Sequence, residues 1–380
     1  MLTYRQLEDA GEAIVRIMAE VEQALINDMA RRIGRLGEVT ATSNYQAFRY
    51  EVVSDVRKIV MEELSRSLVI SERRLVELFD EAATRALGFD NRMYKAAGLT
   101  PAPLTENAYL QQIIRAGLVK TLNTYQNLTM TTANTATMQF ERTLDLAHQL
   151  IVSGGSSYQQ AISEGIRSLA KNGIESVEYA TGRFDDNGNQ IYRTDHMDVA
   201  FRRATLTGVN QTAAELQMEN IRQMGTDLIE TTAHPGARPD HQVWQGRVFS
   251  LSGTHPKYPN FISETGYGTG PGLCGWNCRH SFFPFFEGLS DPAYTADKLR
   301  EYNNKQVAFD GQDMSLYDAT QHQRYIERQI RRWKREASAN EAAGLDSTAA
   351  RAKVHEWQAR QRDFISQTGM SRDYFRERVT

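Results

Sequence analysis

The chain has 380 residues, of which 41% are hydrophobic and 24% charged, as in an ordinary globular protein with two or three domains. Its net charge of −3 favours neither a general nucleic-acid binder nor a strongly acidic protein. No window is apolar for the roughly 20 residues that a membrane helix needs, no apolar signal region is present, and two cysteines cannot build a disulfide framework. We therefore expect no membrane partner and a protein that stays in a cytoplasm unless it leaves inside a particle.

The first 153 residues are predicted to form an all-helical scaffold. Apolar side chains repeat with the 3.6-residue period of a helix over residues 14–29 and again over residues 48–68, so each stretch carries one apolar stripe. A third helix is expected over residues 71–87, because Gly88 is a common type of helix stop.

A proline-containing loop is expected at residues 98–103, followed by a long helix that opens at residues 105–107 and ends near Leu150. The threonine-rich stretch 129–137 is a candidate break in this helix. Helices of this length usually pack on other long helices. The N-terminal region is therefore interpreted either as a docking surface for a partner or as a self-contained bundle.

Residues 154–290 are predicted to form a small α+β domain. After a Gly-Gly break, Ser156 with Gln159 matches a capping box for a short helix that ends at Asn172. The mixture of helix, hairpin and strand that follows is typical of the α+β class.

A β-hairpin is predicted at the turn 185–188, because its Asn-Gly pair favours a two-residue turn in which both central residues have positive φ. A helix over residues 196–224, stopped by Gly225, and a strand at residues 228–232 follow. Beyond this strand lies a loop-rich segment at residues 234–288.

Residues 291–380 are predicted to be a helical tail, so the whole chain is expected to be α+β and mostly α-helical. An apolar stripe from Ile326 to Ala337 marks one face of a helix, and the opposite face carries arginines. These arginines are Arg324, Arg328, Arg331 and Arg335. Such a face can contact the phosphates of a nucleic acid or an acidic partner, but it is more commonly a solvated helix face.

The loop-rich segment holds both cysteines and four of the eight histidines of the chain. Cys274, Cys278 and His280 have a Cys-x3-Cys-x-His spacing, and His234, His241 and His255 are possible further ligands. Zinc prefers tetrahedral sets of Cys and His, and a structural zinc site would suit a region with little core of its own. The alternative interpretation is two buried, reduced cysteines with histidines that are hydrogen-bonded within the fold.

A catalytic interpretation would make this segment a zinc- or cysteine-dependent hydrolase centred on His241, Cys274 and Cys278. A nucleophilic cysteine requires a helix N-terminus and a positioned base, which the sequence does not show, and no GxSxG, HExxH or phosphate-loop motif occurs. Turns formed by Pro and Gly, bulky aromatic anchors and loop-binding arginines explain the segment more economically as a rigid structural module. We therefore expect no enzymatic activity.

Three motifs stand out in this segment. They are His234-Pro-Gly-Ala-Arg-Pro-Asp-His-Gln-Val-Trp-Gln-Gly246, Gly266-Tyr-Gly-Thr-Gly270 and Leu273-Cys-Gly-Trp-Asn-Cys-Arg-His280. Together they resemble the signature of tailed-phage minor capsid proteins, the phage minor capsid protein 2 family. The resemblance extends through residues 202–212, 317–331 and 361–364. Besides the ligand-type residues, the motif positions of structural interest are Arg238, Asp240, Trp244, Gly246, Trp276, Asn277 and Arg279.

The resemblance implies a minor component of the virion, made in the host cytoplasm, that acts in head assembly and is associated with the portal protein, the major capsid protein or both. It implies no catalytic mechanism. More distantly, the helix, strand and loop that end in Cys278-Arg279-His280 are similar to head-morphogenesis (MuF-like) domains, which often end this loop with Cys-Arg-Cys instead. A protein packaged with the DNA, which it would contact through the arginine face, is the remaining alternative.

Overall fold

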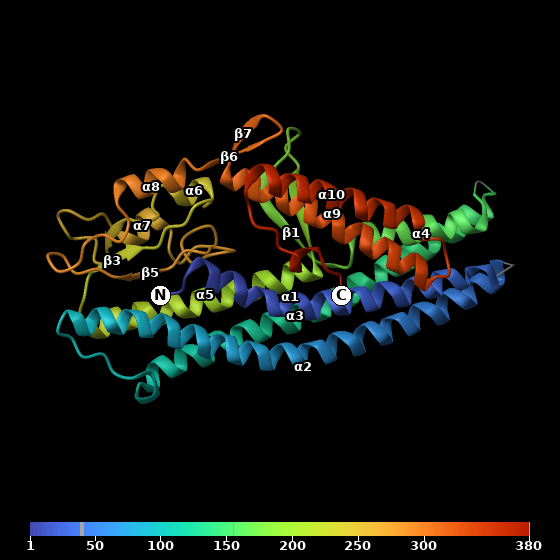
Figure 1. The fold of residues 1–380 in the computed structure, drawn as a ribbon. Helices are drawn as coiled ribbons and strands as arrows, with labels where there is room; N and C mark the ends of the chain where they lie inside the picture. The colour runs from blue at the N-terminus through green and yellow to red at the C-terminus, as the bar shows by residue number, and fades with distance from the viewer. Residues whose placement is uncertain (39–41, 155, 380) are drawn as a thin grey trace. The chain divides into compact units, whose positions relative to one another are not determined.

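The computed structural model of the chain describes residues 1–38, 42–154 and 156–379 and is mostly α-helical, with small antiparallel sheets (Figure 1). The expected class, α+β with a predominance of helix, is confirmed. The helices are α1 (Tyr4–Gly34), α2 (Thr42–Ala96), α3 (Ala108–Val152), α4 (Tyr158–Asn172), α5 (Met197–Met224), α6 (Pro239–Gln242), α7 (Phe261–Thr265), α8 (Ala296–Asn303), α9 (Leu316–Ala342) and α10 (Thr348–Thr368). The strands are β1 (Glu175–Phe184), β2 (Gln190–His196), β3 (Leu228–Thr231), β4 (Val248–Ser250), β5 (Phe282–Pro284), β6 (Gln306–Phe309) and β7 (Gln312–Ser315). No helix in these ranges is long and apolar enough to cross a bilayer.

The chain divides into two compact units, each built from three separate segments. Unit 1 comprises Met1–Ile14, Glu72–Thr124 and Arg202–Gln321, and unit 2 comprises Val15–Ser71, Tyr125–Phe201 and His322–Thr380. This division differs from the three consecutive regions expected at 1–153, 154–290 and 291–380. The reason is that long helices contribute residues to both units, so the ends of helices do not mark the ends of units.

Unit 1 contains the antiparallel sheet β4-β3-β5, drawn in yellow to orange in Figure 1. Its central strand pairs Ile229 with Phe249 of β4 and with Pro284 of β5. All four residues of β3 are buried, and the sheet shares a core with Trp244 and Phe261. The prediction of β3 is confirmed. The strands β4 and β5 were not predicted, because three residues are too few to show the alternation that identifies a strand.

Within unit 1, α3 and α5 approach closely through two reciprocal glycine–threonine pairs. A Cβ added at Gly117 of α3 would lie 1.9 Å from Oγ1 of Thr212 on α5, and a Cβ added at Gly208 of α5 would lie 2.1 Å from Oγ1 of Thr121 on α3. The two pairs run in opposite order along the helices, so this crossing is antiparallel. Only glycine permits the backbones to approach this closely.

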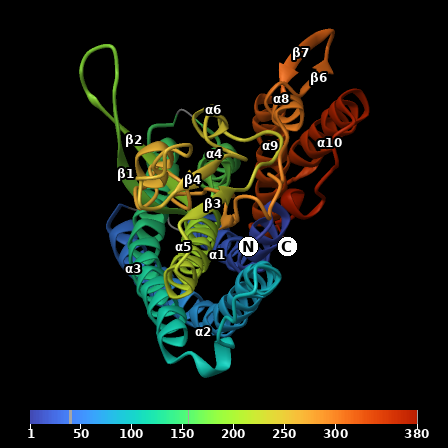
Figure 2. The ribbon, with the colours of Figure 1, turned by 90° about the vertical axis from the view of Figure 1, so that its left-hand side faces the viewer.

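In unit 2, β1 and β2 form the predicted hairpin, whose tip Figure 2 shows as a long ribbon beyond the labelled strands. The expected two-residue turn is wrong, because the strands end at Phe184 and resume at Gln190. Oδ1 of Asp185 accepts from the backbone N–H of Asn187 and Asn189, at 2.9 and 2.8 Å, and holds the wider loop. Within this loop, all of which the structure describes, only Gly188 has positive φ.

The capping box of α4 lies one residue later than the sequence suggested. Ser157 accepts from the backbone of Gln160, whose side chain accepts from the backbone N–H of Ser157. Ser156 and Gln159 match the same pattern, so the sequence could not separate the two registers. The expected Gly-Gly break includes Gly155, which lies outside the described residues.

The predicted interruptions of the two long helices α2 and α3 are wrong. Helix α2 continues through Ser71 and past Gly88, because the roughly 1 kcal/mol that an interior glycine costs is offset by buried neighbours such as Leu87 and Tyr94. Helix α3 continues through the threonine-rich stretch. There, hydroxyls such as that of Thr131 donate to carbonyls of the preceding turn, so the polar groups are satisfied inside the helix.

The tail after residue 290 is less uniformly helical than expected. It includes α8, α9 and α10, but the strands β6 and β7 form an additional hairpin between α8 and α9. This hairpin turns at Asp310, which has a φ of 50°, and at Gly311. Its strands carry few large apolar residues, so hydrophobic patterning gave no signal for them.

Two of the four arginines on α9 point into unit 2 instead of into solvent. Arg335 is 9% exposed, donates to the carbonyl of Ala170 at 3.1 Å and pairs with Glu22 at 3.4 Å. Arg331 pairs with the buried Asp198 at 2.6 Å. The prediction of a solvated arginine face is therefore wrong at these two positions, because acidic partners far away in the sequence neutralise them.

Candidate functional site

The predicted ligand residues come from two stretches of unit 1 that the central sheet brings together. Beyond Thr231, the last residue of β3, the chain enters the short helix α6, which carries His241. Cys278 and His280 lie on the loop before β5, and β5 begins at Phe282, which pairs with Thr231. This register places both stretches at the same end of the sheet.

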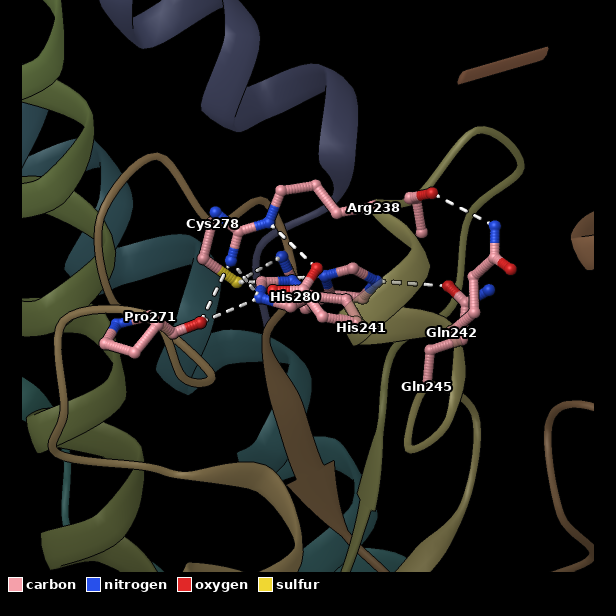
Figure 3. Close-up of polar contacts among 9 residues, drawn as sticks. Arg238, His241, Gln242, Gln245, Pro271, Cys278 and His280 are labelled. Atoms are coloured by element: carbon pink, nitrogen blue, oxygen red, sulfur yellow. Dashed lines mark hydrogen bonds and ion pairs between the residues drawn. The ribbon is translucent and has the colours of Figure 1, made fainter. Parts of the chain in front are cut away.

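His241, Cys278 and His280 form a buried cluster (Figure 3). Sγ of Cys278 lies 3.8 Å from Nδ1 of His241 and 3.7 Å from Nδ1 of His280. One potential ligand atom from each residue lies within 4.8 Å of the other two. The three residues are 3%, 4% and 1% exposed, respectively, so the donor atoms converge in a space shielded from water.

The tautomer of His280 follows from its partner Gln245. The side-chain oxygen of Gln245 accepts from the backbone N–H of His234 at 3.1 Å, which fixes the orientation of the amide. Nε2 of His280 lies 3.0 Å from this oxygen and must therefore carry the proton. The lone pair of Nδ1 then points at Cys278.

The neutral imidazole of His241 can adopt either of its two tautomers. Its Nε2 lies 3.0 Å from the carbonyl of Pro271 and also in close contact with the guanidinium of Arg238. If Nε2 donates to the carbonyl, Nδ1 presents a lone pair to Cys278. If Nε2 instead accepts from Arg238, Nδ1 carries the proton and donates to the sulfur. Arg238 also donates to the carbonyl of Pro271 at 2.9 Å, so this carbonyl anchors both side chains.

Burial shifts every titratable group of the cluster toward its neutral form. It raises the pKa of the Cys278 thiol and lowers the pKa values of His241 and His280, that of His280 well below its usual range. A nucleophilic cysteine requires the opposite shift, toward the thiolate. The electrostatics of the cluster thus favour a structural role over a cysteine nucleophile.

Two of the three remaining candidate ligands, His234 and Cys274, lie beside the cluster. The ring of His234 stacks on that of His280 with centroids 4.4 Å apart, and burial lowers the pKa of His234 to about 4. Its Nδ1 lies 3.1 Å from the carbonyl of Pro235, whereas its Nε2 is buried without a hydrogen-bond partner among the described residues. The thiol of Cys274 donates to the carbonyl of His280 at 3.5 Å. The structure thus brings three of the six candidate ligands into one group and two next to it, whereas Nε2 of His255 lies 3.5 Å from a carboxylate oxygen of Glu287.

The residues of the recognised motifs shape the loops around this cluster. Trp244 packs against the rings of His241 and His280, with centroids 4.6 and 4.8 Å away. Gly246 has a φ of 65°, and a Cβ there would lie 2.5 Å from a methyl group of Leu299. Glycine is required at this position for both reasons.

The other motif residues lie in the loops of residues 234–288, at the edge of the cluster. Arg238 pairs with the exposed Asp240 at 3.3 Å. Trp276 is 59% exposed, and a Cβ at Gly270 would lie 2.6 Å from its indole ring. Asn277 has a φ of 54°, and Arg279 forms an ion pair with Glu8. The ion pair of Arg279 connects this loop to α1.

Two buried amides support the site but were not predicted as part of it. Gln245 binds His280 and, through its nitrogen, Asn303 at 2.6 Å. Asn210 on α5 donates to the carbonyls of Cys278 and His280, at 3.0 and 3.2 Å. Both lie inside the recognised motifs, but a single amide in a sequence gives no sign of whether it is buried.

The comparisons with known proteins agree with the sequence motifs. The chain is 28% identical over 302 residues to a structural protein of Lactococcus phage LL-H, an alignment that covers 76% of each chain. It is 32% identical over 128 residues to a structural protein of Lactococcus phage mv4, which covers 33% of this chain and 94% of that protein. No solved structure matches the chain. The family of phage minor capsid protein 2 matches residues 2–366, so the chain belongs to this family of phage structural proteins.

Proposed function

We propose that this phage structural protein acts in head morphogenesis and binds the portal protein through its long helices. The observation that carries the proposal is membership of the minor capsid family over nearly the whole chain, helical regions included. Helices α2 and α3 have 55 and 45 residues, and at 1.5 Å per residue α2 spans about 80 Å. Elements of this length offer a partner an extended surface.

Both helices expose large apolar side chains that a partner can cover. On α2 they are Tyr50, Val69, Ile70 and Val76, and on α3 they are Tyr109, Val119, Met130, Met138, Leu146 and Val152. Of these, Val69 and Ile70 are adjacent and 53% and 51% exposed, which makes them the most concentrated apolar contact on α2. In this proposal the loop-rich segment of residues 234–288 is a rigid structural module that holds the helices in position.

The experiment is a pull-down of the tagged chain with the portal protein and, separately, with the major capsid protein of the same phage. A variant with Val69→Asp and Ile70→Asp should lose at least about tenfold of its portal binding, equivalent to about 1.4 kcal/mol. Leu289→Asp is the matched control, because Leu289 is 62% exposed but lies outside both helices. Absence of the chain from purified particles, or no binding to either partner, would contradict the proposal.

Packaged DNA is a weaker candidate partner. Of the four arginines considered, Arg331 and Arg335 are engaged with Asp198 and Glu22 inside unit 2, whereas Arg328 is exposed. The loss of two charges from the face reduces the counterion release that would drive binding to phosphates. A salt-dependent gel shift that disappears with Arg328→Glu would revive this alternative.

A further inference from the structure

The buried cluster of His241, Cys278 and His280 in unit 1 plays no part in the proposed docking of the long helices. In one of the two tautomers of His241, the thiol proton of Cys278 is the only hydrogen between its sulfur and the two Nδ1 atoms. When Nε2 of each ring donates to its outer carbonyl oxygen, on Gln245 or Pro271, both Nδ1 lone pairs face the sulfur. One of them then has no hydrogen to accept.

The two sulfur–nitrogen distances of the cluster match the edges of a zinc tetrahedron. With Zn–S of about 2.3 Å, Zn–N of about 2.0–2.1 Å and tetrahedral angles, sulfur and nitrogen ligands lie about 3.6 Å apart. The observed Sγ–Nδ1 distances are 3.7 and 3.8 Å. The outer partners have the arrangement found around zinc-bound histidines, whose second ring nitrogen usually donates to a carboxylate, a carbonyl or water.

The surroundings of the cluster also suit a structural ion. The neighbouring strands β3 and β5 have only four and three residues, and a cross-link from His241 to Cys278 and His280 would tie together segments 37 residues apart. The ring of His234 stacks on His280, and its buried Nε2 has no hydrogen-bond partner among the described residues. His234 lies outside the group within 4.8 Å, so its ring must move inward to bind an ion held by the other three.

We propose that unit 1 binds one zinc ion through Sγ of Cys278 and Nδ1 of His241 and His280, with Nε2 of His234 as the fourth ligand. On binding, the S–H bond of Cys278 breaks, its proton leaves to solvent and a Zn–S bond forms, without any change of oxidation state. Cys274 is not a ligand, because its thiol donates to the carbonyl of His280. The site is structural, since four protein ligands leave no open position for a substrate.

In the competing arrangement, hydrogen bonds alone connect the three side chains and no metal is bound. Arg238 donates to Nε2 of His241, Nδ1 of His241 donates to Cys278, the thiol donates to Nδ1 of His280, and Nε2 of His280 donates to Gln245. This chain satisfies every donor and acceptor except Nε2 of His234. The two arrangements differ in one measurable quantity, the metal content of the protein.

The test uses the full chain, produced with added zinc and purified under reducing conditions. Elemental analysis should find about one zinc per chain, and replacement by Co²⁺ should give a thiolate-to-cobalt charge-transfer band with the intense d–d bands of tetrahedral cobalt. Cys278→Ser should weaken metal binding by more than the 10–100-fold typical of second-shell changes and abolish the charge-transfer band. Cys274→Ser, a matched control in the same buried loop, should keep both metal and band.

Measurements on the unmodified chain keep the proposal testable if Cys278→Ser fails to fold. Chelation should lower the midpoint of thermal unfolding, and added zinc should restore it. A wild-type chain that contains no zinc and takes up no Co²⁺ after chelation overturns the proposal in favour of the cluster that hydrogen bonds alone connect. Equal metal uptake by Cys278→Ser overturns the ligand set, and unchanged affinity in His234→Asn overturns the assignment of the fourth ligand.

Discussion

Replacing Gly208 by alanine should destabilise unit 1, although alanine is the better helix former. The new Cβ would lie 2.1 Å from Oγ1 of Thr121, far inside normal contact distance. Thr121 cannot simply rotate away, because its hydroxyl donates to the carbonyl of Gly117 at 2.9 Å and its Cβ and Cγ2 both lie 3.2 Å from the added atom. The helices α3 and α5 must therefore separate.

The magnitude follows from two opposing effects. Helix propensity favours alanine over glycine by about 1 kcal/mol, whereas overpacking a tight contact costs about 1–3 kcal/mol and more for a backbone shift. We expect the free energy of unfolding to fall by about 1–2 kcal/mol, which lowers the midpoint by about 2–4 °C per kcal/mol for a unit of this size. Gly88→Ala is the matched control, because Gly88 lies inside α2 with nothing within 4 Å of an added Cβ.

Thermal and urea unfolding, followed by circular dichroism, measure both variants against the wild type. Gly88→Ala should stabilise the protein by up to about 1 kcal/mol, so the two glycines respond with opposite sign. Adding Thr121→Ala to Gly208→Ala should recover most of the loss, since only the threonine Cβ position, at 3.2 Å, then remains close. If Gly208→Ala is as stable as the wild type, or if Thr121→Ala brings no recovery, the close approach of α3 and α5 is wrong.

Three further predictions concern single buried or capping groups. Burial raises the pKa of Glu230 to about 7, so the stability that its protonated form contributes is complete below pH 4.5 and is lost as pH rises through about 7. The pKa of Glu327 is also raised to about 7, so in urea unfolding the loss over this range should be up to about 3 kcal/mol smaller in Glu230→Gln than in the wild type. Equal pH profiles of the two proteins would contradict this prediction. Asp198→Asn leaves the guanidinium of Arg331 without its charged partner and should cost about 3–5 kcal/mol in the same assay, whereas a cost below about 1 kcal/mol would mean that the pair is solvated. Ser157→Ala should cost about 1 kcal/mol and Ser156→Ala almost nothing in thermal unfolding, and the reverse order would restore the capping register expected from the sequence.

Local patterns in the sequence were sufficient to predict most of the helices and strands. The 3.6-residue apolar periodicity located α1 and α9, the stop at Gly225 indicated α5, and the strand β3 was found within one residue. Such predictions succeed because a helix or strand must bury one face whatever its partner is. Gly225 ended α5 as expected, since its φ of 65° suits the left-handed residue after a helix.

The site was only partly predictable. The motifs pointed to five ligand-type residues, and the structure groups His241, Cys278 and His280 while leaving Cys274 bound to a backbone carbonyl. Spacing along the chain cannot make this selection, because His241 and Cys278 are separated by 37 residues and meet only through the register of β3 and β5. The supporting amide of Gln245 was missed for the same reason.

By itself, the sequence determined the class of the fold, the order of its main helices, the hairpin and the family, because each depends on neighbouring residues or on the order of motifs along the chain. The tertiary structure decided the rest. In the tertiary structure α2 is continuous past Gly88, and Arg331 and Arg335 pair with acidic side chains. The tertiary structure also determines which of the candidate ligands lie together. These outcomes depend on contacts between distant segments, where burial and the partner of each charge are set by the packing of the whole unit rather than by local pattern.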